Sequence, residues 1–119
     1  MTRFIGEKIL MRIFIGEGDR WGSSPLHEAL LELLRREGCA GATVLRGVAG
    51  FGASSVCHTA RLLDLSADLP MVVEVVDDQE RLDALMPKID DMMTGGMITL
   101  EKATVIRYTP AGKGAAATP

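Results

Sequence analysis

The order of apolar segments along the chain constrains its fold more than any other feature. Two segments carry the period of an amphipathic helix, and the stretches around them are short and rich in β-branched residues, as strands are. The predicted strands are Ile9–Ile15, Ala42–Val48, Met71–Val76 and a final extended segment in two pieces, Met97–Leu100 and Thr104–Tyr108. The order is therefore strand, helix, strand, strand, helix, strand.

The first helix is predicted from its end signals and its leucines. Ser24 offers an N-cap oxygen, Pro25 suits the first helical position, and Gly38 marks the end. Four leucines form the apolar stripe, namely Leu26, Leu30, Leu33 and Leu34. Four charged residues form the solvent-exposed side, namely Glu28, Glu32, Arg35 and Arg36. Residues 16–22 are predicted to be a loop, in which Trp21 either anchors the loop or packs over a neighbouring subunit or a ligand.

The second helix is expected to begin after Asp77 or Asp78, either of which can cap it, and to end at Gly95-Gly96. Its predicted inner face comprises Leu82, Leu85, Ile89, Met92 and Met93. Pro87 lies inside this pattern, so we expect a kink or a break at that point.

This order of elements is that of the α+β ferredoxin-like fold (βαββαβ), a four-stranded antiparallel sheet with two helices on one face. The helix side is predicted to hold Met11, Ile13, Leu45, Val73, Val75 and Ile106. The opposite side then holds Leu10, Arg12, Phe14, Val44, Arg46, Val72, Glu74, Val76, Val105 and Arg107. That face is too apolar to stay bare, and its charges survive burial only in pairs, so we predict a cyclic homo-oligomer.

Composition narrows the class of protein. The 119 residues suffice for one domain, placed at 1–108, with a flexible tail of small residues at 109–119. A net charge of −3 and an aromatic content of 4% disfavour nucleic-acid binding. Two cysteines make no disulfide framework, and Cys39 is expected to be buried. Neither a secretory signal nor an apolar run of membrane-spanning length is present, so we expect a cytoplasmic protein that does not insert into a membrane.

Three glycines lie within six residues in the stretch Arg46-Gly47-Val48-Ala49-Gly50-Phe51-Gly52. Glycine lets a ligand approach the backbone, and successive amides in such turns bind anionic oxygens. A hairpin turn or a bulge explains the same glycines equally well. The spacing matches neither a dinucleotide-binding fingerprint nor a P-loop. The connector up to Pro70 is longer than ordinary loops, which favours a functional role.

Metal binding and catalysis have weaker support. Cys57 and His58 are adjacent and His27 has no partner at a recognised spacing, so ordinary polar loop residues are the favoured interpretation. The acidic pairs Asp77-Asp78 and Asp90-Asp91 fit helix capping and solvation better than acid–base catalysis. We predict no catalytic residue and no metal site.

Several stretches together resemble the PII-like family known as domain of unknown function 190. They are Ile13–Glu17, Pro25–Leu30, Gly41–Gly52 and Asp68–Pro70, and the resemblance spans roughly residues 9–108. The most specific motif is Arg-Gly-x-x-Gly-Phe-Gly at residues 46–52. The resemblance implies a ferredoxin-like homotrimer whose long loop reaches toward a partner.

In PII proteins an adenine nucleotide binds between subunits, so the resemblance implies a similar site here. Its residues would be Arg46, Gly47, Gly50, Phe51 and Gly52, then Thr94, Gly95 and Gly96, and finally Arg107. Glycine amides and an arginine fork suit phosphate oxygens. ATP, ADP or AMP is the implied ligand. A membrane transporter or channel is the implied partner, because members of this family are commonly encoded near fluoride-channel proteins.

The sequence departs from PII proteins at three points. Ala53-Ser54 replace the Arg-Gln pair that helps to hold magnesium and 2-oxoglutarate, and Met97 replaces a lysine that supports phosphates. No tyrosine occurs between Gly52 and Pro70, which argues against tyrosyl nucleotidylation. The replacement at Ala53-Ser54 leaves open whether 2-oxoglutarate or magnesium is sensed.

Two alternatives share the predicted fold. A CutA-like trimer would respond to a metal through Cys57, His58 or His27. A small enzyme would need a catalytic base in the cleft, and the sequence offers none. The favoured hypothesis is a non-enzymatic regulatory protein that binds a small anion between subunits and controls a partner through the 50–70 loop.

Overall fold

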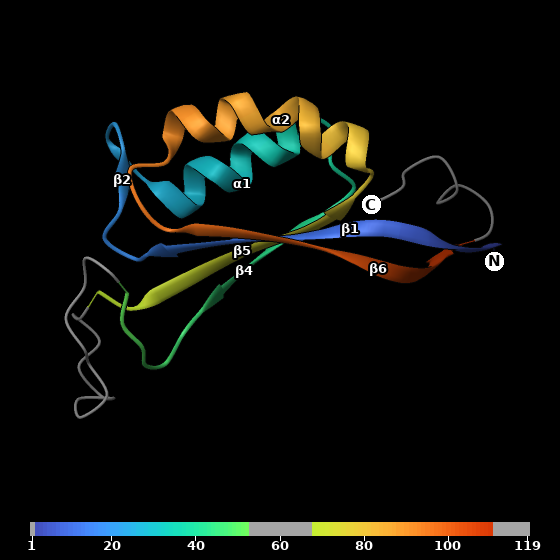
Figure 1. Ribbon diagram of the computed structural model, residues 1–119, viewed down its shortest axis with the longest axis horizontal. Coiled ribbons are helices and arrows are strands. Elements are labelled where there is room, and N and C mark those ends of the chain that lie inside the picture. Colours follow the sequence, from blue (N-terminus) through green and yellow to red (C-terminus); the bar gives the residue numbers. More distant parts are fainter. Residues whose placement is uncertain (1, 53–67, 111–119) are drawn as a thin grey trace.

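The computed structural model describes residues 2–52 and 68–110 and shows a four-stranded antiparallel sheet with two helices on one face (Figure 1). The elements are β1 (Thr2–Gly16), β2 (Arg20–Trp21), β3 (Ser24–Pro25), α1 (Leu26–Arg36), β4 (Ala42–Arg46), β5 (Pro70–Asp77), α2 (Gln79–Met92) and β6 (Met97–Thr109). The strand order β4-β5-β1-β6 is that of the ferredoxin-like fold, so the predicted architecture is confirmed.

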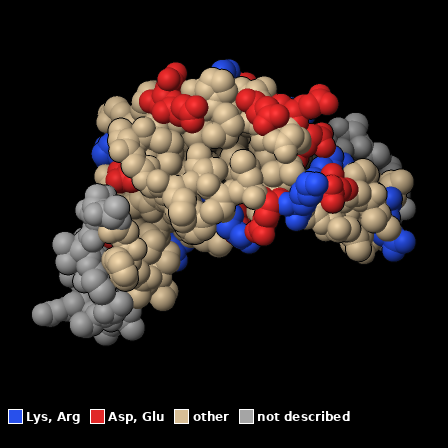
Figure 2. Space-filling view, viewed as in Figure 1, with Lys and Arg blue, Asp and Glu red and all other residues tan. Residues whose placement is uncertain are grey.

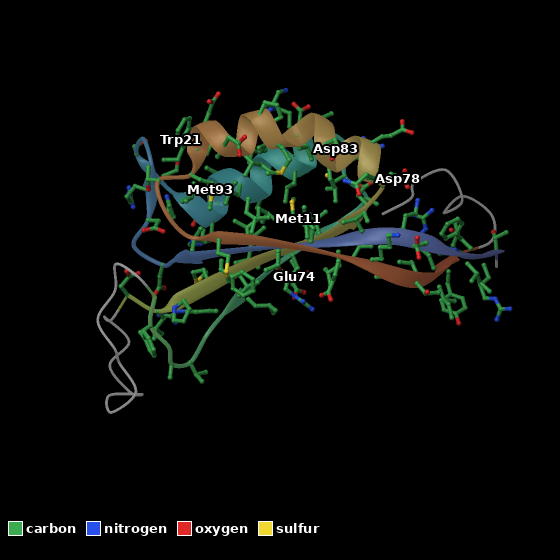
Figure 3. The ribbon with its side chains drawn as sticks, viewed as in Figure 1. Met11, Trp21, Glu74, Asp78, Asp83 and Met93 are labelled. Atoms are coloured by element: carbon green, nitrogen blue, oxygen red, sulfur yellow. The ribbon has the colours of Figure 1, made fainter. Side chains whose placement is uncertain are left out.

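The core forms between the sheet and the helices because both helices turn an apolar stripe inward. The buried helical residues are Leu26, Leu30, Leu33 and Leu34 of α1 and Leu82, Leu85, Ile89 and Met92 of α2. They pack on the strands around Met11, Ile13, Val73 and Val75, and Figure 3 shows Met11 between the two layers. The outer side of the helical layer carries many acidic side chains, at the top of Figure 2. The predicted buried and solvent-exposed sides of α1 are therefore confirmed.

The ends of α1 are built differently from each other. At the C-terminal end, the Gly38 N–H donates to the Arg35 carbonyl and the Cys39 N–H donates to the Leu34 carbonyl. These bonds confirm that Gly38 marks the end of the helix, as predicted. At its start the predicted Ser24 cap is wrong, because Ser24 and Pro25 form the strand β3.

The stretch before α1 is a small hairpin rather than a simple loop. Trp21 lies in β2, opposite Ser24 of β3, and is 46% exposed. The Leu26 N–H donates to the Asp19 carbonyl over 2.7 Å. A carbonyl of the preceding turn thus provides the hydrogen-bond acceptor that the first N–H of α1 lacks within the helix. The predicted loop at 16–22 is thus corrected to the end of β1, a turn and β2.

The start of α2 is anchored by the buried carboxylate of Asp77. This carboxylate accepts hydrogen bonds from the Asp78 N–H (2.7 Å), from Arg81 Nε (3.1 Å) and from the Ala40 N–H (3.3 Å). The helix then runs unbroken to Met92, so a break at Pro87 is wrong, and a kink there stays a prediction. Buried side chains before and after the proline pack into the same core, and that packing outweighs one missing hydrogen bond.

Strands β1 and β6 are longer than predicted. β1 begins at Thr2 rather than Ile9, and β6 runs without interruption through residues 101–103. The two strands pair continuously from Thr2 opposite Thr109 to Phe14 opposite Met97, so each supplies backbone partners for the other. Residues 2–8 and 102–109 extend past the helices, at the right of Figure 1; we call this two-stranded part the arm.

Two residues assigned to the helix side are exposed. In β4, Val44 pairs opposite the buried Val73, so Val44 lies on the helix side and its predicted place on the open side is wrong. Leu45 therefore faces the open side and is 48% exposed. Each alternation of β4 contains one large apolar residue, Val44 or Leu45, so only the pairing with β5 decides which of them faces the core. Ile106 lies opposite Ile5 in the arm, beyond the cover of the helices, and is 53% exposed. β4 also ends at Arg46, two residues earlier than predicted.

Candidate functional site

Hydrogen bonds to the backbone hold together the two ends of the connection between β4 and β5. The Gly47 N–H donates to the Pro70 carbonyl over 2.7 Å. The Glu17 N–H, in the turn after β1, donates to the Leu69 carbonyl over 2.8 Å. We call residues 46–52 and 68–70 the loop base. The interior of the predicted 50–70 loop, residues 53–67, lies outside the described residues.

Packing on Pro70 accounts for two of the three glycines in the cluster. A Cβ added at Gly47 or Gly50 would lie 3.0 Å or 2.8 Å from the Cγ atom of Pro70. Small residues are thus needed at these positions for the two ends to approach, as the turn interpretation predicts. Phe51 lies beside them and is 74% exposed. An aromatic ring so exposed is available to a ligand or to another chain.

Arg46 pairs with Glu17 rather than with the charges of the open face. Its Nε atom lies 3.0 Å from Oε2 of Glu17, and its Nη2 atom donates to Oε1 over 3.1 Å. Arg46 follows Val44 on the helix-side alternation of β4, so its predicted place on the open face is wrong. The side chain sits at the loop base, where the resemblance places an anion.

The turn between α2 and β6 contains the second group of predicted residues. Gly96 has φ of +94°, and an added Cβ would lie only 2.3 Å from the Phe14 carbonyl oxygen, so the turn itself requires glycine there. An added Cβ at Gly95 meets nothing within 4 Å among the described residues. Thr94 and Gly95 are exposed and can approach another molecule.

The loop base and this turn lie at the same end of the sheet but on opposite edges. Arg46 pairs with Met71 of β5, and Met97 pairs with Phe14 of β1. Strands β5 and β1 lie between β4 and β6, so the two groups are separated by roughly 14 Å of strand spacings.

Arg107 lies at the other end of the molecule. It pairs opposite Phe4 in the arm, ten residues along β1 from Phe14, which corresponds to roughly 33 Å of extended strand. One chain therefore does not bring Arg107 together with the loop base or with the turn after α2. The predicted site residues occupy three separate places in the protomer.

The surroundings of Arg107 are partly cationic. Its guanidinium carbon lies 5.4 Å from the centre of the Phe4 ring, and Lys8 Nζ lies 5.0 Å from the same ring. The Nε atom of Arg107 is buried and finds no hydrogen-bond partner among the described residues. A groove of about 410 Å³ runs past it, lined by residues including Leu10, Glu74 and Val105. Neither Phe4 nor Lys8 was predicted, because no periodic signal marked residues 2–8 as strand.

The open face of the sheet carries a network of ion pairs at its centre. Arg12 donates from Nε to Glu74 (2.8 Å) and from Nη1 to Glu101 (2.7 Å), and these hydrogen bonds, Glu74 first, raise the pKa of Arg12. Glu74 points away from the helices in Figure 3. Apolar side chains surround the network, namely Leu10, Phe14, Leu45, Val72 and Val76. The predicted apolar face is confirmed around the pair of Arg12 and Glu74, whereas Val44 and Arg46 were wrongly assigned to it. Glu101 was missed because an interruption of the strand was expected there.

Metal binding has no support within the described residues. In residues 2–52 and 68–110 no group of three or more His, Cys, Asp or Glu side chains is placed to hold a metal ion. His27 lies 3.9 Å from Glu28, while Cys57 and His58 fall outside the described residues. Cys39 packs against the core, and burial raises the pKa of its thiol. In the same part of the chain, no helix has the length and apolar character needed to span a bilayer.

Comparison with known proteins identifies the family. Residues 8–105 match DUF190, described as uncharacterized ACR, COG1993. The chain belongs to this family. A UPF0166 protein of Aquifex aeolicus (strain VF5) is 36% identical over 100 residues, which cover 84% of this chain and 94% of that protein. UPF0166 protein MJ1524 of Methanocaldococcus jannaschii is 29% identical over 99 residues, covering 82% and 91%.

Solved structures similar to this DUF190 chain are PII-like. CPII of Thiomonas intermedia K12, bound to ADP and bicarbonate, superimposes with a TM-score of 0.57 at 16% identity, covering 86% of this chain and 91% of that one. TTHA0516, a PII-like protein of Thermus thermophilus, gives a TM-score of 0.56 at 15% identity, with coverages of 87% and 91%. At these identities the likeness establishes a PII-like fold.

Proposed function

We propose that this DUF190 protein is a cytoplasmic, non-enzymatic PII-like regulator that assembles as a homotrimer. It binds a small anion, an adenine nucleotide such as ATP, ADP or AMP, in the clefts between subunits. Binding changes the 50–70 loop and thereby controls a partner, for which a membrane transporter or channel is the proposed class.

The separation of the predicted ligand residues carries this proposal. Arg107 and the loop base lie at opposite ends of one protomer, roughly 33 Å apart along the strands. A site that uses both therefore needs two copies of the chain. The open face supports such an assembly, because Leu45 and Val76 are 48% and 37% exposed in the isolated protomer.

The chemistry of the dispersed residues fits an anion. Arg107 has a buried Nε–H whose hydrogen-bonding capacity is unused among the described residues, and Lys8 lines the same groove. Gly95 leaves its backbone open to close approach. An arginine fork and exposed amides are the groups that proteins use for phosphate oxygens. The bound ADP in CPII makes a nucleotide the first ligand to test.

The proposal is tested by calorimetric titration with ATP, ADP and AMP, together with sedimentation of the free protein. We expect a trimer whose nucleotide binding is lost in Arg107→Ala and in Arg46→Ala. Lys102→Ala removes the same charge from an exposed position of β6 and should bind normally. No heat and no change in melting temperature with all three nucleotides would reject the nucleotide as ligand.

A further inference from the structure

The carboxylate of Glu17 already occupies the edge of Arg46 that an anion would use. Both carboxylate oxygens are engaged, Oε2 with Nε at 3.0 Å and Oε1 with Nη2 at 3.1 Å. The Nη2 contact is a hydrogen bond and the Nε contact is an ion pair. The Nε–Nη2 edge is one that arginine turns toward the two oxygens of a carboxylate or a phosphate. The side chains of Arg46 and Glu17 are 41% and 31% exposed, so a dissolved ligand can reach the pair.

The backbone fixes Glu17 beside its partner. The Glu17 N–H donates to the Leu69 carbonyl at 2.8 Å, and the Gly47 N–H, next to Arg46, donates to the Pro70 carbonyl at 2.7 Å. The carboxylate is therefore held near Arg46 as an intramolecular competitor of any dissolved anion.

We infer that Glu17 competes with the ligand for Arg46 and is a specificity-determining residue of the site. This inference rests on the proposed function, because it concerns the same anion site. A ligand that binds the Nε–Nη2 edge of Arg46 must displace the carboxylate, so its apparent affinity scales with the fraction of molecules in which the pair is open. An anion that offers two oxygens to Nε and Nη2 replaces both lost contacts, whereas an anion that offers one does not.

The test is the affinity for ADP of the wild-type protein and of Glu17→Gln. The amide keeps the size of the side chain and the backbone bond to Leu69, but it cannot form the charged pair. We expect about two- to fivefold tighter binding, because partly exposed ion pairs are individually weak. A side chain that only stabilised the loop base would give the opposite result, since its loss would weaken binding.

Two further variants separate competition at Arg46 from a general effect of charge. Glu28→Gln removes the same charge from an exposed position on α1 and should leave the affinity unchanged. In an Arg46→Lys background, which lacks the fork, Glu17→Gln should no longer tighten binding. Equal tightening by Glu28→Gln, or persistence of the gain beside Lys at position 46, would overturn the inference.

The outcomes also distinguish this inference from the proposed function. Binding by the wild-type protein with equal or weaker binding by Glu17→Gln rejects the competition alone. Absence of ADP binding in every variant rejects the nucleotide site, and the competition with it.

Discussion

The two faces of the sheet come from the same strands but differ in what covers them. On the helix side Met11, Ile13 and Val73 are all 0% exposed. On the open side Leu45 and Val76 are 48% and 37% exposed, although these residues are similarly apolar. The helices account for the first face, and no described segment covers the second (Figure 1). Apolar faces of this kind are seldom left bare, and in the proposed trimer sister chains would cover this one.

The largest expected effect is the loss of assembly when a charge is placed on the open face. Val72→Glu puts an unpaired carboxylate among Leu45, Phe14 and their neighbours, and we expect the trimer to dissociate to monomers in sedimentation velocity. Leu31→Glu makes the same change on the exposed side of α1 and should leave a trimer. A wild-type protein that sediments as a monomer would show that the open face is not covered by sister chains.

The helix face should respond through folding stability. Leu30→Ala removes a side chain with 0% exposure, and we expect the free energy of unfolding to fall by about 2–5 kcal/mol in urea. Leu31→Ala, at a neighbouring position that is 37% exposed, should cost less than about 1 kcal/mol. Both variants are compared at one protein concentration, because assembly contributes to apparent stability. Equal losses would mean that the helical layer does not cover the core as described.

A smaller effect is expected from the ion-pair network. Glu74→Gln removes one of the two carboxylates bound to Arg12. If the network is buried in a trimer interface, the protein concentration at which half of the trimer is dissociated should rise by about tenfold. Glu32→Gln breaks the exposed pair with Arg35 on α1 and should not move the midpoint. If both variants dissociate like the wild type, the network lies in solvent.

The smallest effect concerns the link between Lys8 and Asp78, which joins the arm to the start of α2. The hydrogen bond from Lys8 lowers the pKa of Asp78 below its ordinary 3.8. The folded state therefore favours the ionised carboxylate of Asp78. The ion pair stabilises the fold fully at pH values above the pKa of Asp78 in the unfolded chain, and this contribution is lost as the pH falls through the pKa of Asp78 in the folded protein. The stability difference between wild type and Asp78→Asn should thus shrink below about pH 4. A difference that stays constant in acid would show that the charge of Asp78 does not matter.

The sequence predicted the element order because strong local patterns marked each segment. The leucines of α1 and the inner face of α2 set both helices correctly. Errors arose where pairing outweighs local preference. The Thr2–Lys8 segment has no strand pattern of its own and is extended because β6 pairs with it, and the side on which Leu45 lies depends on its partner strand.

The candidate site was predicted in part. The resemblance named Arg46, Arg107 and the turn after α2, and the structure shows why one chain cannot unite them. Nothing in the sequence indicated that Glu17 holds Arg46, because the two residues are 29 positions apart and meet only through the fold. Packing against Pro70 and Phe14 explains several of the glycines without any ligand.

The central claim is that Arg46 of one copy and Arg107 of another serve the same site. Its most direct test mixes Arg46→Ala and Arg107→Ala chains, each unable to bind ADP alone, by unfolding and refolding them together and titrating the product with ADP. In a cyclic assembly with random mixing, about one quarter of the sites receive both native arginines, and binding should return to that extent. No recovery in trimers shown to be mixed would contradict the claim.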